Sequence, residues 1–180
     1  NFTSATDSYN TAMGFNAGSA VTTGIQNTIV GGISGDAITT GDFNTSLGYA
    51  ALSATTTADM NTAIGRTTLQ ANTTGANNTA VGGQALQTNT TGANNTAVGM
   101  GALVQNTEGL RNSALGFNAG AGVTNGDNNV MIGEAAGNHS VVTTTGIQNT
   151  LIGSQTRADS AGSGQTVAIG YDVAGTGGYT

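Results

Sequence analysis

A five-residue pattern recurs along the whole chain: an asparagine, a threonine, a small residue, a large aliphatic residue and a glycine. The clearest copies are NTAVG at 78–82 and at 95–99. The last residue, here called the repeat glycine, stands at positions 14, 31, 48, 65, 82, 99, 116, 133, 153 and 170. The interval is 17 residues throughout, except for one step of 20. Recurrence at a fixed period indicates a repeat architecture.

The residue before each repeat glycine is always aliphatic, which predicts that it faces the core. These residues form what we call the aliphatic column: Met13, Val30, Leu47, Ile64, Val81, Val98, Leu115, Ile132, Ile152 and Ile169. Two residues earlier stands a β-branched residue in most repeats, such as Thr79 or Thr96, which favours a strand. A second glycine recurs seven residues before the repeat glycine, and we expect a left-handed turn there. Each repeat therefore predicts a strand, a turn, a strand and a turn.

A 17-residue unit is too short for a helical hairpin repeat, which needs about 33 residues, and fits a two-strand coil of a β-roll. Such coils stack at ~4.8 Å, so ten of them give a rod on the order of 45 Å long. The sequence predicts an all-β fold, a parallel β-roll or β-solenoid of about ten 17-residue coils. We expect residues 1–180 to be a single array and an excerpt of a longer fibre chain.

The residue between the threonine and the aliphatic residue should point away from that predicted core, yet it is apolar in nearly every repeat. This middle column consists of Ala12, Ile29, Ala63, Ala80, Ala97, Ala114, Met131, Leu151 and Ala168, with Ser46 as its polar member. An exposed apolar stripe usually marks an interface, and a stripe parallel to the rod axis suits rotational symmetry. We therefore predict that these residues form the interface of a homotrimer. The alternative, a row of exposed alanines without a task, agrees poorly with Ile29, Met131 and Leu151.

The repeat resembles the head repeats of trimeric autotransporter adhesins, the YadA-like heads with the pentapeptide NSVAIG. Its counterparts here are NSALG at 112–116 and TVAIG at 166–170. The longer form NTTGxxNTAVG resembles repeats of phage tail fibres and of bacterial surface proteins that end in an endosialidase-type chaperone domain. The resemblance covers all repeats, although the 17-residue period is longer than is usual in adhesin heads. It implies a left-handed parallel β-roll that trimerises, attaches to a host or matrix, and has no catalytic residues.

Composition narrows the range of partners. Nine acidic residues against three arginines give a net charge of −6, which would repel the phosphates of nucleic acids and anionic lipids. No run of 18 apolar residues exists that would insert into a membrane. The chain has no cysteine, so disulfides and thiolate metal sites are excluded.

The side chains that could take part in catalysis or ligand binding do not recur at fixed positions of the repeat. The nine carboxylates hold no constant place in the repeat, which predicts solvated turn residues and not the facing pair of a glycosidase. His139 is the single histidine, and a metal site would need three copies of it on a symmetry axis. Phe15, Tyr49, Phe117 and Tyr171 follow repeat glycines, where we expect packing between coils more than stacking on sugars. We therefore predict no enzyme activity, no metal and no cofactor.

Two columns of polar residues are expected to be structural or to face water. Asparagine opens most repeats, at Asn10, Asn27, Asn44, Asn61, Asn78, Asn95, Asn112, Asn129 and Asn149. Such a column predicts an amide ladder from coil to coil. A threonine column nine residues before the repeat glycine, including Thr73 and Thr90, could form a flat surface.

The one break in the period lies between Gly133 and Gly153, where three extra residues enter. An insertion into a stacked array must leave the coil as a bulge. Its side chains Asn138, His139, Val141 and Val142 are a candidate receptor contact; the alternative is a tolerated surface insertion.

The leading hypothesis is a structural and host-attachment segment of a trimeric phage tail fibre or fibrous surface adhesin, in the virion or at a cell surface. Its further partner would be a glycan or protein of the host cell surface. The closest alternative is the head of a bacterial trimeric adhesin. An ice-binding solenoid and a polysaccharide-degrading tailspike are alternatives from other functional classes.

Overall fold

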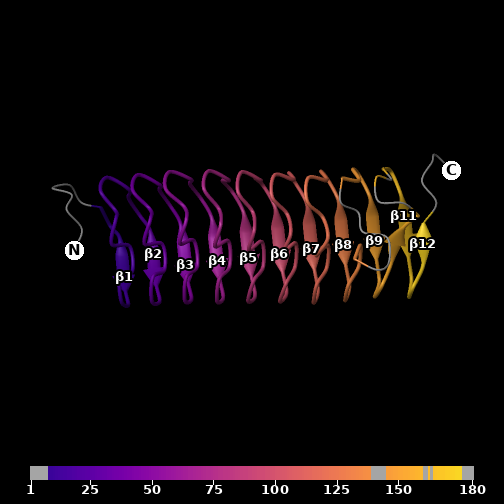
Figure 1. The fold of residues 1–180 in the computed structure, drawn as a ribbon, viewed down its shortest axis with the longest axis horizontal. Coiled ribbons are helices and arrows are strands. Elements are labelled where there is room, and N and C mark those ends of the chain that lie inside the picture. Colours follow the sequence, from indigo (N-terminus) through magenta and orange to yellow (C-terminus); the bar gives the residue numbers. More distant parts are fainter. Residues whose placement is uncertain (1–7, 139–144, 160–161, 163, 176–180) are drawn as a thin grey trace.

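The computed structural model describes residues 8–138, 145–159, 162 and 164–175, and within them all regular elements are β-strands. Figure 1 shows a rod in which the chain winds in successive coils, with β1 at one end and β12 at the other. Each coil contributes one three-residue strand to a long sheet that runs the length of the rod. The predicted all-β parallel solenoid is therefore confirmed.

The main sheet has 10 strands in the order β1-β2-β3-β4-β5-β6-β7-β8-β9-β11, and all its pairs are parallel. The strands are β1 (Thr11–Met13), β2 (Thr28–Val30), β3 (Thr45–Leu47), β4 (Thr62–Ile64), β5 (Thr79–Val81), β6 (Thr96–Val98), β7 (Ser113–Leu115), β8 (Val130–Ile132), β9 (Thr150–Ile152) and β11 (Val167–Ile169). Equivalent positions pair: Thr79 lies opposite Thr96 and Val81 opposite Val98. Each sequence column is thus a row of neighbouring side chains along the rod.

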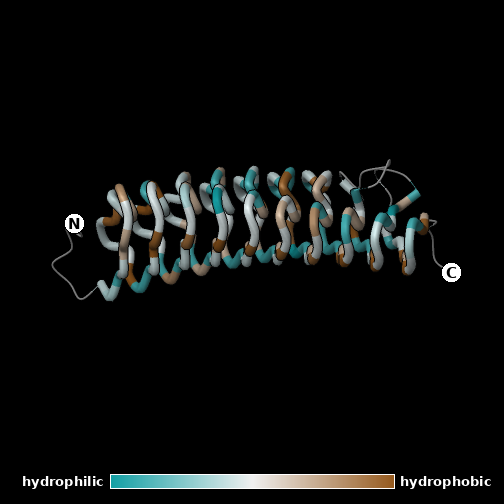
Figure 2. The backbone as a smooth tube through the Cα atoms, turned by 90° about the horizontal axis from the view of Figure 1, so that it is seen from below, coloured by the Kyte–Doolittle hydropathy of each residue, from teal (hydrophilic) through white to brown (hydrophobic). Residues whose placement is uncertain are grey.

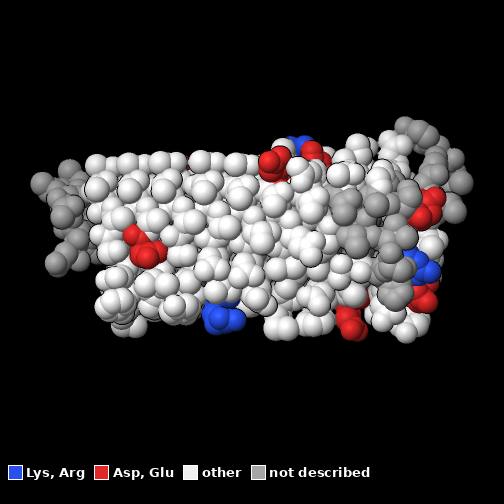
Figure 3. Space-filling model, in the orientation of Figure 1, with Lys and Arg blue, Asp and Glu red and all other residues white. Residues whose placement is uncertain are grey.

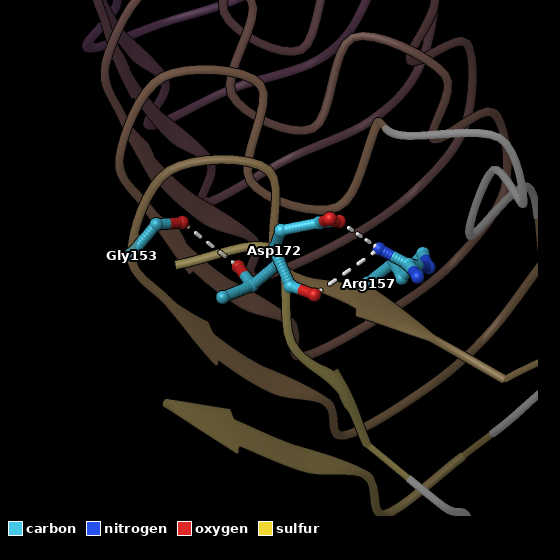
Figure 4. A network of polar contacts seen from close by, with 4 residues as sticks. Gly153, Arg157 and Asp172 are labelled. Atoms are coloured by element: carbon cyan, nitrogen blue, oxygen red, sulfur yellow. Dashed lines mark hydrogen bonds and ion pairs between the residues drawn. The ribbon is translucent and has the colours of Figure 1, made fainter. Parts of the chain in front are cut away.

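The last coils add a second, two-stranded sheet of β10 (Arg157–Ala158) and β12 (Ala174–Gly175). Beside it the Arg157 guanidinium forms an ion pair with the Asp172 carboxylate, as Figure 4 shows. The Thr156 hydroxyl donates to the carbonyl of Gly153 at 2.9 Å in the same network. The ion pair ties the corners of the last two coils together, and the Thr156 hydrogen bond closes a turn within one of them.

The strands present the opposite faces from those that the sequence predicted. The middle column, predicted to form an exposed trimer interface, lies inside the coil: Ala12 is half-buried, and Ile29, Ala63, Ala80, Ala97, Ala114, Met131, Leu151 and Ala168 are at most 2% exposed. The aliphatic column, predicted to be core, faces outward, with Leu47 at 46% and Leu115 at 51% exposed. The prediction that the middle column is an interface between chains was therefore wrong, because its side chains fill the core of their own chain.

Residues four positions after the repeat glycine form the wall that faces the middle column, and side-chain sizes on the two walls are complementary. Where the opposite wall carries Leu52, Leu69, Leu86 and Leu103, the middle column carries alanine. Where the opposite wall is glycine, the middle column is large: a methyl group on Gly120 would lie 2.8 Å from the Met131 sulfur. One on Gly18 would lie 2.9 Å from Ile29. This exchange keeps the narrow interior at close-packed density.

The buried leucines of the opposite wall accept an unfavourable backbone to fill the core. Leu86, for example, has φ of 50°, in the left-handed region, and is fully buried. A left-handed conformation costs a residue with a Cβ roughly 1–2 kcal/mol. Burying a leucine side chain contributes about 2–3 kcal/mol, so packing outweighs the backbone cost.

Ser46 is the one polar side chain of the middle column, and its hydroxyl is satisfied inside the core. It lies 2.5 Å from the Ser34 hydroxyl and donates to the carbonyl of Ala51 at 2.9 Å. The serine pair separates a small apolar cluster of Val21, Ile29 and Ile38 from the long core beyond it.

Both recurring glycines are required by close approach between coils. At Gly82, φ is 126°, and a Cβ would lie 2.6 Å from the carbonyl of Gly99 in the next coil. The glycine seven residues earlier was predicted to adopt a left-handed turn, but its φ is not positive in the described coils. A Cβ on Gly24 would instead meet the carbonyl oxygen of Gly41 at 2.5 Å. The prediction that this position requires glycine was correct, but the reason given for it, a left-handed turn, was wrong.

The complementary packing predicts a compensating pair of substitutions. Met131→Ala should cost about 2–4 kcal/mol of unfolding free energy because it leaves a cavity, and Gly120→Leu alone should cost about 1–3 kcal/mol by overpacking. The double variant recreates the leucine–alanine pairing of neighbouring coils and should be more stable than either single variant. Urea unfolding of the four proteins measures this; additive costs would contradict the size exchange.

Candidate functional site

The outward surface of the main sheet carries a row of exposed or half-exposed aliphatic side chains. It consists of the aliphatic column and, beside it, the strand threonine column: Thr11, Thr28, Thr45, Thr62, Thr79, Thr96, Ser113, Val130, Thr150 and Val167. We call these two columns together the outer face. Neither column contains a charged side chain. Figure 2 shows that hydrophobic segments recur at the same place in successive coils, so they form a continuous row along the rod.

Buried asparagines fix which side of each strand faces out. Asn44, Asn78, Asn95 and Asn112 are 0% exposed. Each is two residues before a middle-column residue, and residues two apart in a strand share a face. The asparagine and the middle residue therefore both point inward, and the threonine and the aliphatic residue between and beyond them point outward.

Each of these asparagines joins its coil to the next through two backbone groups. The Asn95 Oδ1 accepts the backbone N–H of Asn112 at 2.9 Å, and the Asn95 Nδ2 donates to the carbonyl of Gly109 at 2.8 Å. The same acceptor contact continues from Asn10 to Asn149. The predicted amide ladder is therefore confirmed.

A second amide ladder lies beside the first and was not predicted; Asn95 and Asn106, one from each ladder, both donate to the carbonyl of Gly109, at 2.8 and 3.2 Å. The Nδ2 of Asn89 donates to Oδ1 of Asn72, and that of Asn106 donates to Oδ1 of Asn89, both at 2.8 Å. All three side chains are fully buried. Their spacing of 17 residues was visible in the sequence, but no ladder was predicted at these positions.

The side of the rod behind the sheet is polar. Its side chains include Gln84, Gln87 and Gln70, and the Gln87 amide donates to the Gln70 carbonyl oxygen at 3.1 Å. In the view of Figure 3 the charged side chains are few, acidic and basic ones gather at the upper edge and at one end of the rod, and most of the remaining surface is uncharged. The rod is therefore amphipathic across its width, with an apolar outer face and a polar back.

Threonines of the column nine residues before the repeat glycine form hydrogen bonds between neighbouring coils. The Thr73 hydroxyl donates to the carbonyl of Thr90, and the Thr90 hydroxyl donates to that of Thr107, both at 3.0 Å. These hydroxyl protons are engaged with the neighbouring coil. The contacts favour a structural role for the column over the alternative of a water-ordering surface.

The carboxylates were predicted to be solvated turn residues, but some of them form specific hydrogen bonds or are partly buried. Asp42 accepts the backbone N–H of Ile25, and Asp127 that of Leu110, at 2.8 and 2.7 Å. Desolvation raises the pKa of Asp36, whose Oδ1 is buried without a hydrogen-bond partner. In the part of the chain that the structure describes, no group of three acidic or histidine side chains is placed to hold a metal ion.

The aromatic residues that follow repeat glycines are exposed over much of their surface, so packing between coils covers only part of each ring; the Tyr49 ring lies beside Gly32 of the preceding coil. Phe15, Tyr49, Phe117 and Tyr171 border the outer face, and Phe15 is 77% exposed. The apolar surface of the rod is thus widened by rings along one edge.

Of the candidate receptor contact, Asn138 is half-buried and its backbone N–H donates to the carbonyl of Ala135 at 3.0 Å. His139, Val141 and Val142 lie outside the described residues. Among the described residues no helix is long and apolar enough to cross a membrane.

Comparison with known proteins gives no relative: no family model, no curated protein and no solved structure matches the chain.

The buried amide predicts a large effect from one substitution. Asn95→Ala leaves the N–H of Asn112 buried without a partner and removes one of the two donors to the Gly109 carbonyl, which should lower the free energy of unfolding by about 1–3 kcal/mol. Thr91→Ala, at an exposed position in the same region, should change it by less than about 0.5 kcal/mol. Equal urea midpoints for the two variants would show that the ladder does not hold the coils together.

Proposed function

We propose that this chain is a structural and host-attachment segment of a homotrimeric fibre, of the kind found in phage tail fibres and fibrous surface adhesins. The observation that carries the proposal is the outer face: an uninterrupted aliphatic column on the outside of a rod whose own core is already filled. A soluble monomer rarely exposes a contiguous apolar surface of this kind.

Within a single chain, polar residues could replace the aliphatic column without loss. Its side chains are directed away from the core, and the coils are held together by backbone ladders and asparagines. Covering a half-exposed aliphatic side chain contributes about 1 kcal/mol. Association costs several kcal/mol, roughly 4–15. Only a long row of such side chains offsets that cost, and the rod supplies one in every coil.

A three-fold bundle suits the shape of this surface. The outer face is straight, parallel to the rod axis and only a few residues wide, so three copies can place it around a common axis with their polar backs toward water. Valine, leucine and isoleucine beside threonine are small enough to fill the space near such an axis. A rigid rod of this type separates flanking parts of a fibre and presents its polar back to the surroundings.

The outer face predicts that a charge in the aliphatic column breaks the assembly. Val98→Asp would place three carboxylates near the axis, where they repel one another and lose hydration. The variant should elute as a folded monomer, because the side chain does not enter the core. Light scattering after size exclusion measures the mass, and circular dichroism the fold.

Gln105→Asp is the matched control, because it adds the same charge to an exposed position of the same coil away from the outer face. It should keep the mass of the parent. If Val98→Asp also keeps that mass, the outer face is not the interface.

A further inference from the structure

The apolar core of the rod is divided between the second and third coils, each coil being counted from its opening asparagine. Ser34 of the second coil and Ser46 of the third are both fully buried, and their hydroxyl oxygens lie 2.5 Å apart. On one side of this pair lies the small apolar cluster that contains Ile29, and on the other the long core that begins at Ala51. The apolar contacts that run along the rod are therefore interrupted at the two serines.

The side chains of the small cluster pack within the first two coils. A methyl group on Gly18 would lie 2.9 Å from the Cδ1 of Ile29, and one on Gly35 would lie 2.9 Å from the Cδ1 of Ile38. The two isoleucines therefore fill the space that these glycines leave open in their own part of the rod. Neither isoleucine belongs to the apolar cluster that fills the core from the third coil onward.

Later coils show which residues occupy the two serine positions where the core is continuous. Ser34 is the third residue after its repeat glycine, and that position is alanine at Ala85 and Ala102. Ser46 stands in the middle column, where a later coil has Ala97. These three alanines are fully buried members of the long core. Serine and alanine differ by one hydroxyl oxygen, so the interruption is one of polarity and not of space.

Backbone contacts cross the same boundary without a gap. The N–H of Gly35 donates to the carbonyl of Ala51 at 2.8 Å, and Ile29 lies opposite Ser46 in the main sheet. The boundary thus keeps its hydrogen bonds and lacks apolar contact in the core. The stability of a repeat protein is approximately the sum of its repeats and of the interfaces between neighbours. A stack of coils separates first at the interface that contributes least.

We infer that the rod contains a cooperative boundary between its second and third coils, so that the residues up to Phe43 open and close as one unit while the long core stays folded. A rod with this boundary has a defined conformational step at one point instead of opening one coil at a time. It yields there without losing the rest of its length. The inference concerns a single chain and does not depend on the proposed self-association.

Native-state hydrogen exchange of the full chain tests the boundary. The N–H of Gly31 bonds the second coil to the first, that of Gly35 bonds the second to the third, and that of Gly65 bonds the fourth to the third. Gly31 and Gly35 should share one opening equilibrium, and Gly65 should exchange at least about ten-fold more slowly. Simple fraying from the end would instead give three graded rates. Protection that rises evenly along these three amides would overturn the inference.

Removing the serine pair should remove the step. Ser34→Ala/Ser46→Ala restores the alanines of later coils, and replacing both partners of a buried hydrogen bond by apolar groups of the same shape is close to neutral for stability. The difference between Gly35 and Gly65 should then fall to about two-fold or less. Ser53→Ala is the matched control, because Ser53 lies in the third coil and is only half-buried. The control should keep the ten-fold step.

The converse variant moves the boundary. Ala85→Ser/Ala97→Ser places the same pair at the equivalent positions of the fifth and sixth coils, where both alanines are fully buried. The amide of Gly82 should then exchange at least about ten-fold faster than that of Gly116, whereas the two rates are similar in the parent chain. A step that persists in Ser34→Ala/Ser46→Ala, or the absence of a new step in a folded Ala85→Ser/Ala97→Ser protein, would show that the buried hydroxyl pair does not set the boundary.

Discussion

The buried asparagine at the start of most repeats makes the interaction on which the rest of the fold depends. Its amide accepts a backbone N–H and donates to a backbone carbonyl of the neighbouring coil, as Asn95 does with Asn112 and Gly109. Both groups lie where the chain bends, beyond the reach of the sheet ladder. Leaving a buried polar group unpaired costs about 1–3 kcal/mol, so a strand that turned its asparagine outward would lose several kcal/mol in every coil. The asparagine therefore determines the orientation of the strand.

That orientation determines what remains for the surface. With the asparagine inside, the middle column must fill the core, and it does so in exchange with the opposite wall, alanine against leucine and Met131 against Gly120. The aliphatic column is then left outside. Exposing an aliphatic side chain costs less than orphaning two polar groups, and this cost disappears when another copy covers the surface. The same constraint thus explains a filled core and an apolar exterior.

The fold was predictable from the sequence because the period, the strand position and the parallel stacking all follow from the spacing of the repeat glycine. The facing of the strand was assigned the wrong way round from the sequence, because Ala97 and Val98 are both apolar and hydrophobicity alone does not show which of them is buried. Two signals in the sequence could have decided it. The first is that Ala97 stands two residues after Asn95 and so lies on the same side of the strand as the asparagine, whose ladder had been predicted. The second is that a glycine such as Gly120 occurs where its neighbour, Met131, is large, which marks the two positions as neighbours in one core. Aromatic rings that directly follow a repeat glycine, such as Phe15, were assigned to packing between coils because the corner where the chain turns away from the sheet cannot be placed from spacing.

The central claim is that the outer face is covered by copies of the same chain. The most direct measurement is the mass of the unmodified chain by light scattering, over a dilution series from micromolar concentration downward. The account predicts three times the 17.5 kDa of one chain. A well-folded particle of 17.5 kDa at micromolar concentration would contradict it.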